Sequence, residues 1–111
     1  MMRWEKLLSI AEMERIKVNE VRSIQLTNKR ICFARLSDGF YALDDKCPHA
    51  QGSLGEGKCD NEENVICPSH RYKYDIKTGK GKQGDYVNAY PVELREDGLY
   101  IGLMKKWWQI F

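Results

Sequence analysis

Short runs of alternating apolar and polar residues cover most of this chain, and turn residues separate them. Alternation with a period of two predicts strands that bury one face. The expected strands span residues 4–8, 15–26, 30–36, 40–43, 65–66, 72–74, 89–94 and 99–103. No apolar stripe with helical spacing extends over ten or more residues. The pattern therefore predicts an all-β fold, a small antiparallel sandwich or barrel.

Turn and cap signals mark the borders of these strands. Ser9 is followed three residues later by Glu12, a capping-box pattern that predicts a short helical turn after the first strand. The sequence Ser-Asp-Gly at 37–39 predicts a hairpin, and Glu-Asp-Gly at 96–98 predicts the last one. Three glycines between 79 and 84, interleaved with lysines, predict a mobile loop.

The alternation stops after Asp44, where two cysteine–histidine motifs begin. Cys47 and His49 form a C-x-H motif, and Cys67 and His70 form a C-x-x-H motif after a loop of 17 residues. The only two histidines of the chain belong to these motifs. One thiolate and one imidazole from each of two loops can hold a two-iron cluster, with both cysteines on one iron and both histidines on the other.

Two other interpretations use the same donors. Zinc also binds thiolate and imidazole, although a structural zinc site usually pairs its cysteines in a C-x2-4-C knuckle. A cysteine–histidine nucleophile is a further alternative, which metal bonds to both thiols would prevent. We expect Cys47, His49, Cys67 and His70 to be metal ligands, and we expect no catalytic residues.

The residues around these motifs resemble the Rieske [2Fe-2S] family. The resemblance includes Leu54 and Gly57 after the first motif, Tyr74-Asp75 and Thr78-Gly79 after the second, and more weakly Tyr90-Pro91 and Asp97-Gly98. It is greatest for small soluble members, the ferredoxins of ring-hydroxylating oxygenases and the small subunits of nitrite reductases. It implies one Rieske-type [2Fe-2S] cluster in a single domain, 1–111, whose two-loop cluster-binding subdomain spans about 45–85.

Departures from the family pattern bear on the reduction potential. High-potential members join their loops by a disulfide at the positions of Gly52 and Ser69, and place a serine where this chain has Tyr72. We expect Tyr74 to keep one such hydroxyl donor, at a position where many ferredoxins have phenylalanine. Fewer donors to sulfur predict a potential in the lower half of the Rieske range of roughly −150 to +300 mV. Arg71 stands where much of the family has glycine, either facing the cluster or pointing to solvent.

Length and charge narrow the function further. The chain has 111 residues and a net charge of +2, which does not favour nucleic acid as a partner. No apolar run approaches the roughly 18 residues of a membrane span. The start of the sequence lacks the apolar core of a secretory signal, so we expect a cytoplasmic protein. Cys32 reads as a small buried residue and Cys59 as a free thiol in a polar loop.

We therefore expect an electron carrier, not an enzyme. It would pass single electrons from a flavin reductase to an oxygenase or another terminal oxidoreductase. Alternatively, it is the small subunit of a nitrite-reductase-like complex, with a role in relay and assembly; a redox sensor is a third hypothesis. Five cations between 71 and 82 either form a solvated face or steer an acidic partner. Trp107 and Trp108 in the tail either pack back on the sandwich or contact a partner.

Overall fold

The computed structural model describes residues 2–47, 52–69 and 71–104. Its strands are β1 (Met2–Ser9), β2 (Glu20–Gln25), β3 (Arg30–Leu36), β4 (Gly39–Asp44), β5 (Lys58–Cys59), β6 (Asn64–Ile66), β7 (Lys73–Asp75), β8 (Ala89–Tyr90), β9 (Val92–Arg95) and β10 (Gly98–Met104). The helical pieces in these ranges are α1 (Ile10–Arg15) and the 3-10 turn η1 (Leu54–Glu56). None of them is long and apolar enough to cross a membrane.

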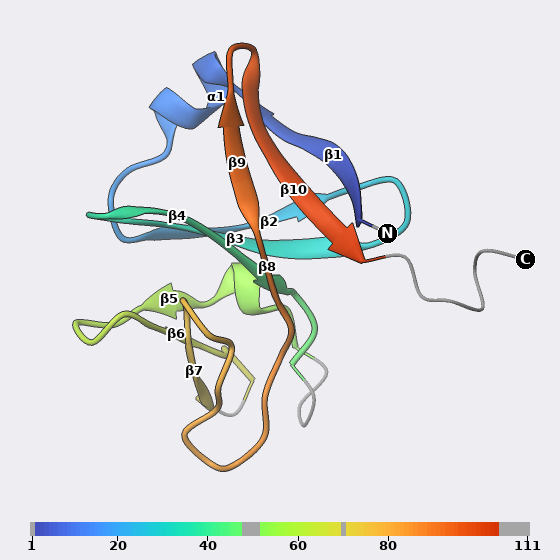
Figure 1. The fold of residues 1–111 in the computed structure, drawn as a ribbon. Coiled ribbons are helices and arrows are strands. Elements are labelled where there is room, and N and C mark those ends of the chain that lie inside the picture. The colour runs from blue at the N-terminus through green and yellow to red at the C-terminus, as the bar shows by residue number, and fades with distance from the viewer. Residues whose placement is uncertain (1, 48–51, 70, 105–111) are drawn as a thin grey trace, which may run out of the picture.

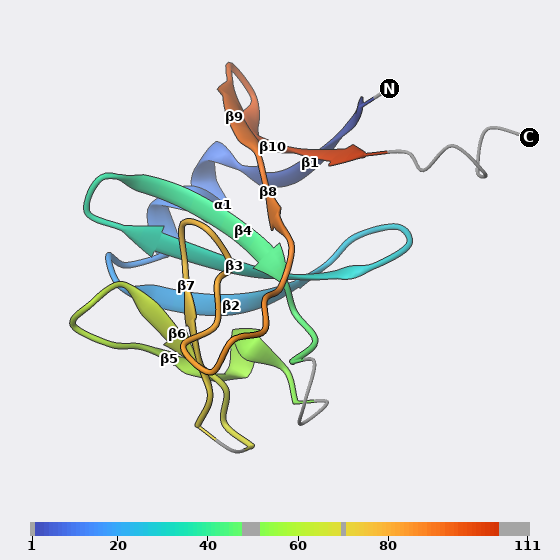
Figure 2. The same cartoon turned by 60° about the horizontal axis from the view of Figure 1, so that its bottom comes forward.

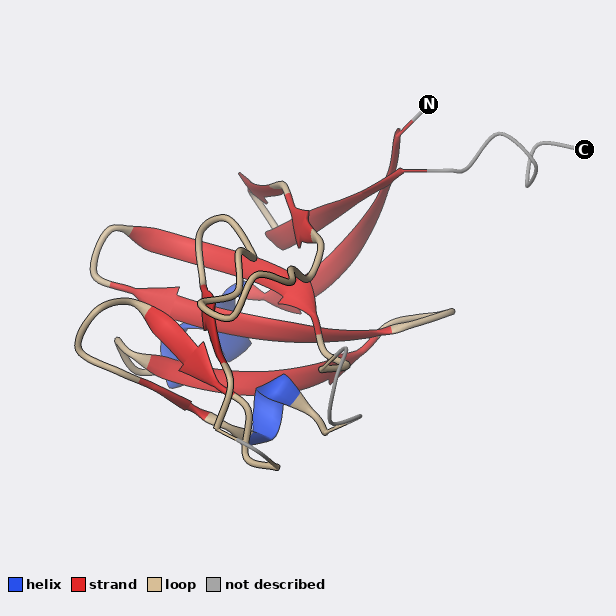
Figure 3. Ribbon diagram, turned by 90° about the horizontal axis from the view of Figure 1, so that it is seen from below, coloured by secondary structure: helices blue, strands red, loops and turns tan. Residues whose placement is uncertain are grey.

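Within the described ranges the strands form three antiparallel sheets. Their strand orders are β1-β10-β9, β2-β3-β4-β8 and β5-β6-β7. In Figures 1 and 3 the sheet of β2, β3, β4 and β8 lies between the other two. The predicted all-β antiparallel fold is thereby confirmed, and the small sheet of β5, β6 and β7 forms the layer that carries the second motif.

The middle sheet is buried on both faces. On one face Ile31 and Phe33 pack with Leu99 and Ile101 of β10. On the other face Cys32 and Ala34 of β3 belong to the core beneath the third sheet. Consecutive residues of β3 are therefore buried, as expected for a strand covered from both sides. The buried position predicted for Cys32 is confirmed, and burial raises the pKa of its thiol.

Most predicted elements are confirmed, and the capping box is among them. The Ser9 hydroxyl accepts a hydrogen bond from the Glu12 amide, and the Glu12 carboxylate accepts one from the Ser9 amide. The prediction of a strand from residue 15 was wrong, because β2 begins at Glu20. Ile16 instead ends α1 and is buried, and Asn19 turns the chain at a φ of 69°, a region that asparagine tolerates.

The single strand predicted at 89–94 is two strands in different sheets. β8 pairs with β4 in the middle sheet, and β9 pairs with β10 in the outer sheet. Pro91 lies between them and has no amide hydrogen to donate to a ladder, while its carbonyl accepts a hydrogen bond from Gly102. This crossing joins the outer sheet to the middle one.

Two smaller expectations also need correction. Cys59 lies in the short strand β5 and not in a loop, and its half-buried thiol donates to the carbonyl of Asp60. Tyr72 precedes β7 instead of starting it. The glycine-rich segment after β7 is held by backbone hydrogen bonds from Asp75 to Lys80 and from Val87 to Gly79.

Candidate metal centre

The segments that follow β4 and β6 both run below the middle sheet in Figures 1 and 2, and Cys47 and Cys67 lie at the start of these segments. Both side chains are 0% exposed and belong to one buried cluster. All four cysteines of the chain are described, and none forms a disulfide. His49 and His70 lie outside the described residues, so their assignment as ligands stays a prediction.

Backbone hydrogen bonds close both loops at their cysteines. The Cys47 amide donates to the Gly52 carbonyl at 2.9 Å. The Cys67 amide donates to the Tyr72 carbonyl at 2.8 Å, and its carbonyl accepts from the Arg71 amide at 2.8 Å. Each motif is thus presented by a loop whose two ends are fixed, a prerequisite for a preformed metal site.

The two loops touch at Gly52. A Cβ atom built on Gly52 would lie 2.4 Å from the Ser69 hydroxyl oxygen and 3.2 Å from the Cys67 sulfur. Only glycine leaves this space open. Positions 52 and 69 therefore face each other across the loops, which agrees with the family pattern that joins them by a disulfide elsewhere.

Asp45 anchors the first loop to the middle sheet. Its buried carboxylate accepts hydrogen bonds from the Ser23 hydroxyl at 2.8 Å, the Ser53 hydroxyl at 2.6 Å and the Gly55 amide at 2.8 Å. Arg30 forms an ion pair with it at 3.7 Å. Sequence reasoning missed this residue; the available signal was a carboxylate two positions before the first ligand, where strand alternation ends.

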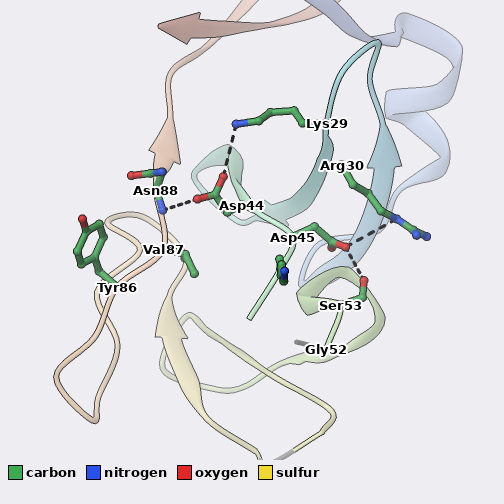
Figure 4. Close-up of a pocket in the computed structure, with 10 residues that line it drawn as sticks. Lys29, Arg30, Asp44, Asp45, Gly52, Ser53, Tyr86, Val87 and Asn88 are labelled. Atoms are coloured by element: carbon green, nitrogen blue, oxygen red, sulfur yellow. Dashed lines mark hydrogen bonds and ion pairs between the residues drawn. The ribbon is translucent and has the colours of Figure 1, made fainter. Parts of the chain in front are cut away.

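A hollow of about 660 Å³ lies beside this anchor, as Figure 4 shows. Four of the charged side chains that line it form two ion pairs. Lys29 lies 3.8 Å from Asp44, whose carboxylate also accepts from the Asn88 amide, and Arg30 is paired with Asp45. Tyr86, 70% exposed, lines the hollow from the segment before β8. Both carboxylates are therefore held at the base of the first loop.

Arg71 adopts the left-handed conformation that the family's glycine would favour. Its φ is 59°, and its amide closes the second loop. A residue with a side chain is uncommon there, because its Cβ approaches the neighbouring backbone. The turn expected from the family pattern is thus kept without glycine.

Tyr74, in β7, contacts Cys47 of the first motif. Its hydroxyl oxygen is 3.5 Å from the Cys47 sulfur and donates a hydrogen bond to Asp85 at 2.7 Å. Burial and the hydrogen bonds with Cys47 and Asp85 raise the pKa of the Tyr74 phenol, so it keeps its hydrogen at neutral pH. The contact between Asp85 and Tyr74 was not predicted from the sequence.

Two of the five cations near the second motif are paired. Lys73 lies 3.4 Å from Asp60, and Lys77 lies 2.7 Å from Asp38 and 3.3 Å from Glu63. Within the ranges that the structure describes, Arg71, Lys80 and Lys82 form no ion pair. The predicted positive patch is therefore carried by these three side chains.

The buried thiols fit an iron site better than a nucleophile. Two soft sulfur donors on adjoining loops, excluded from solvent and not joined to each other, are the ligand set that iron–sulfur clusters use. A cysteine nucleophile is instead accessible to its substrate.

The assignment of the thiols to an iron site agrees with the family comparison: residues 4–95 match the family model of the Rieske [2Fe-2S] domain. The chain belongs to this family.

Relatives of this Rieske domain include carriers for oxygenases. The chain is 31% identical over 80 residues to the 3-phenylpropionate/cinnamic acid dioxygenase ferredoxin subunit of Escherichia coli K12, covering 69% of this chain and 76% of the relative. A chain in the solved complex of reduced oxygenase and oxidized ferredoxin in carbazole 1,9a-dioxygenase matches with a TM-score of 0.78 and 25% identity, covering 93% of this chain and 95% of that one.

A solved structure of another kind of protein shares the fold. A Mycobacterium tuberculosis protein, described as a candidate NADH-dependent nitrite reductase small subunit, matches with a TM-score of 0.81 at 14% identity. The match covers 96% of this chain and 99% of that one. At this identity the likeness shows the fold alone.

The family match also identifies the cofactor of the chain, which is a [2Fe-2S] cluster.

Proposed function

We propose that this chain is a one-electron carrier whose cluster is held by Cys47, His49, Cys67 and His70. The observation that carries the proposal is the pair of buried cysteines on two adjoining, hydrogen-bonded loops of a Rieske domain. When bound, the cluster takes up and releases one electron at a time. We further propose one domain over 1–111, with the cluster-binding part at about 45–85.

The residues of this chain supply rigidity and insulation. Asp45 and the loop-closing amides hold the two cysteines in place, so that little rearrangement accompanies electron transfer. Leu54, Val65 and Tyr74, all buried, exclude water from the protein side of the cysteines. A low local dielectric and few polar donors disfavour added negative charge, which supports a potential in the lower half of the Rieske range.

The proposed partners are a flavin reductase as donor and an oxygenase as acceptor. The relatives named above are the ferredoxin subunit of a dioxygenase and a chain from a complex of an oxygenase with a ferredoxin. Arg71, Lys80 and Lys82 offer positive charge beside the second motif, which suits an acidic docking surface. The carrier would be cytoplasmic and would not turn over a substrate by itself.

Iron content and electron paramagnetic resonance test the cluster. We expect two irons per chain, a red-brown protein, and a resonance signal that appears only on reduction. Cys47→Ala and Cys67→Ala should abolish all three, whereas Cys59→Ala, a matched cysteine outside the motifs, should retain them. One zinc per chain and no iron would contradict the proposal.

Partner assignment needs a separate measurement. Affinity purification from cells that express the chain at natural levels should recover an oxygenase and a reductase, and the recovered reductase should reduce the cluster in stopped-flow mixing. Recovery of a large flavin and sirohaem subunit instead would favour the nitrite-reductase alternative.

A further inference from the structure

The Tyr74 hydroxyl lies between two acceptors and has one hydrogen to give. The Asp85 carboxylate oxygen is 2.7 Å away, and the Cys47 sulfur is 3.5 Å away. As a metal ligand Cys47 would be a thiolate, which has no hydrogen of its own. Only one of the two contacts can then hold the phenol hydrogen at a time.

Asp85 is the stronger acceptor. A hydrogen bond from a hydroxyl to a carboxylate is short, charge-assisted and roughly twice as strong as one between neutral groups. The sulfur is a weaker acceptor, and the Tyr74 hydroxyl oxygen lies 3.5 Å from it but only 2.7 Å from the Asp85 carboxylate oxygen. The hydrogen therefore goes to Asp85, and the Cys47 sulfur receives none from Tyr74.

The carboxylate of Asp85 is held in place for this role. Its second oxygen accepts a hydrogen bond from the Gln83 side chain, so both oxygens act as acceptors, as in the ionised form. The Gly81 amide donates to the Asp85 carbonyl at 2.8 Å. A Cβ atom at Gly81 would lie 2.2 Å from the carboxylate oxygen, so glycine there leaves the room that the carboxylate occupies.

We propose that Asp85 is a positioning residue that withholds the Tyr74 hydrogen from the Cys47 sulfur and thereby keeps the reduction potential of the cluster low. Hydrogen bonds to a ligand sulfur stabilise the reduced, more negative state. This inference rests on the proposed function, because it needs Cys47 to be a ligand. It differs from a simple charge effect, since it acts through Tyr74.

Replacing Asp85 by alanine tests the inference with the midpoint potential of the intact protein. Asp85→Ala should raise the potential, because the phenol hydrogen turns to Cys47 and a negative charge is lost. Tyr74→Phe alone should leave the potential close to wild type. In the double variant Asp85→Ala/Tyr74→Phe only the loss of charge remains, so the rise should be clearly smaller.

Gly81→Ala separates geometry from charge. Its methyl group displaces the Asp85 carboxylate from Tyr74 but leaves the charge on the chain, so the potential should still rise. Resonance Raman spectra add a direct signature: an iron–sulfur stretch that shifts in D2O should appear in Asp85→Ala and Gly81→Ala, and be absent from Tyr74→Phe and from the double variant. Cys59→Ala serves as an unrelated control.

The outcomes are distinguishable. Equal rises for Asp85→Ala with and without Tyr74 would overturn the inference, because Asp85 would then act by charge alone. A marked fall of the potential in Tyr74→Phe would also overturn it, since Tyr74 would already donate to sulfur. If either of these results is obtained in a protein with a normal cluster, the inference fails but the proposed function stands. A normal cluster in Cys47→Ala would remove the proposed ligation and this inference together.

Discussion

Single residues determine where the two cysteines lie, one through its side chain and the other through its backbone conformation. The Asp45 carboxylate joins β2, the first loop and η1 through three hydrogen bonds in a buried site. Such bonds are valuable because the donors would otherwise be buried without partners. At the second loop the backbone of Arg71 adopts the strained left-handed conformation, at a φ of 59°. One loop is held by side-chain chemistry and the other by a conformational constraint.

We predict that Asp45→Ala destabilises the protein by about 3 kcal/mol, as expected when a buried hydrogen-bonded carboxylate is removed and its donors lose their acceptor. Urea unfolding of the iron-loaded protein measures the change. Asp38→Ala, which removes an exposed carboxylate paired with Lys77, should destabilise the protein much less. Similar losses in both variants would argue against the anchoring role of Asp45.

Substitutions at Arg71 should follow backbone preference and not charge. Glycine at this position relieves the left-handed strain but adds freedom to the unfolded chain, so Arg71→Gly should change stability by less than about 1 kcal/mol. Arg71→Val should cost about 1–2 kcal/mol more, because a β-branched residue tolerates this conformation poorly. Urea midpoints at constant m-value measure both, and equal stability of the two variants would contradict the prediction.

At the scale of elements, the hairpin of β5 and β6 leads directly into the second motif. Its turn is organised by Asp60, whose carboxylate accepts from the amides of Glu62 and Asn64 and from the Asn64 side chain. Lys73 of β7 pairs with the same carboxylate. Asp60 therefore joins the turn of the hairpin to the next strand, β7.

This hairpin should contribute to acid sensitivity. Burial alone would raise the pKa of Asp60, but the hydrogen bonds from Asn64 and Glu62 and the Lys73 ammonium together lower it below its ordinary value of 3.8. A lowered folded pKa means that the contribution is complete above the ordinary value and is lost as pH falls through the folded one. We predict that wild type loses more stability than Asp60→Asn as the pH falls below about 4.

Urea midpoints measured at several pH values for both proteins provide this comparison. The difference between the two curves isolates Asp60, because the other carboxylates are common to both. Glu62→Gln in the same turn leaves the Asp60 contacts in place and should follow the wild-type curve. Parallel curves for wild type and Asp60→Asn would show that Asp60 carries no such linkage.

At the scale of the whole molecule, two cores share the middle sheet. One core lies between the middle sheet and the sheet of β1, β10 and β9, and uses no residue of the metal-binding layer. The other contains Cys47 and Cys67 among its buried members. The sheet of β5, β6 and β7, which is the metal-binding layer, has short strands. Its stability therefore depends on the core that contains the two cysteines and on the metal that they hold.

Removal of the cluster should therefore loosen one layer of the molecule before the others. In hydrogen exchange of the iron-depleted protein we predict at least about tenfold faster exchange in β6 and β7, while β10 and β3 keep most of their protection. Mass spectrometry of peptides from both regions measures it. Uniform loss of protection throughout the described strands would show instead that the two cores unfold together.

The sequence alone was sufficient for most of the strands, the capping box and the motif, because each depends on neighbours a few residues apart. Alternation places Ile31 and Phe33 on one face of β3 whatever the rest of the chain does, and the Ser9–Glu12 pair closes within one turn. The spacing of Cys47, His49, Cys67 and His70 predicted the cofactor through the family resemblance, and the family match confirms that cofactor.

Only the tertiary structure decided the contacts between distant segments. The Asp45 network joins residues 22 positions apart in sequence, and the Tyr74–Asp85 bond depends on how the segment after β7 folds back. The split of residues 89–94 into β8 and β9 depends on which sheet each half meets. Such choices are set by long-range packing and by competition for a single hydrogen, which local patterns along the chain do not encode.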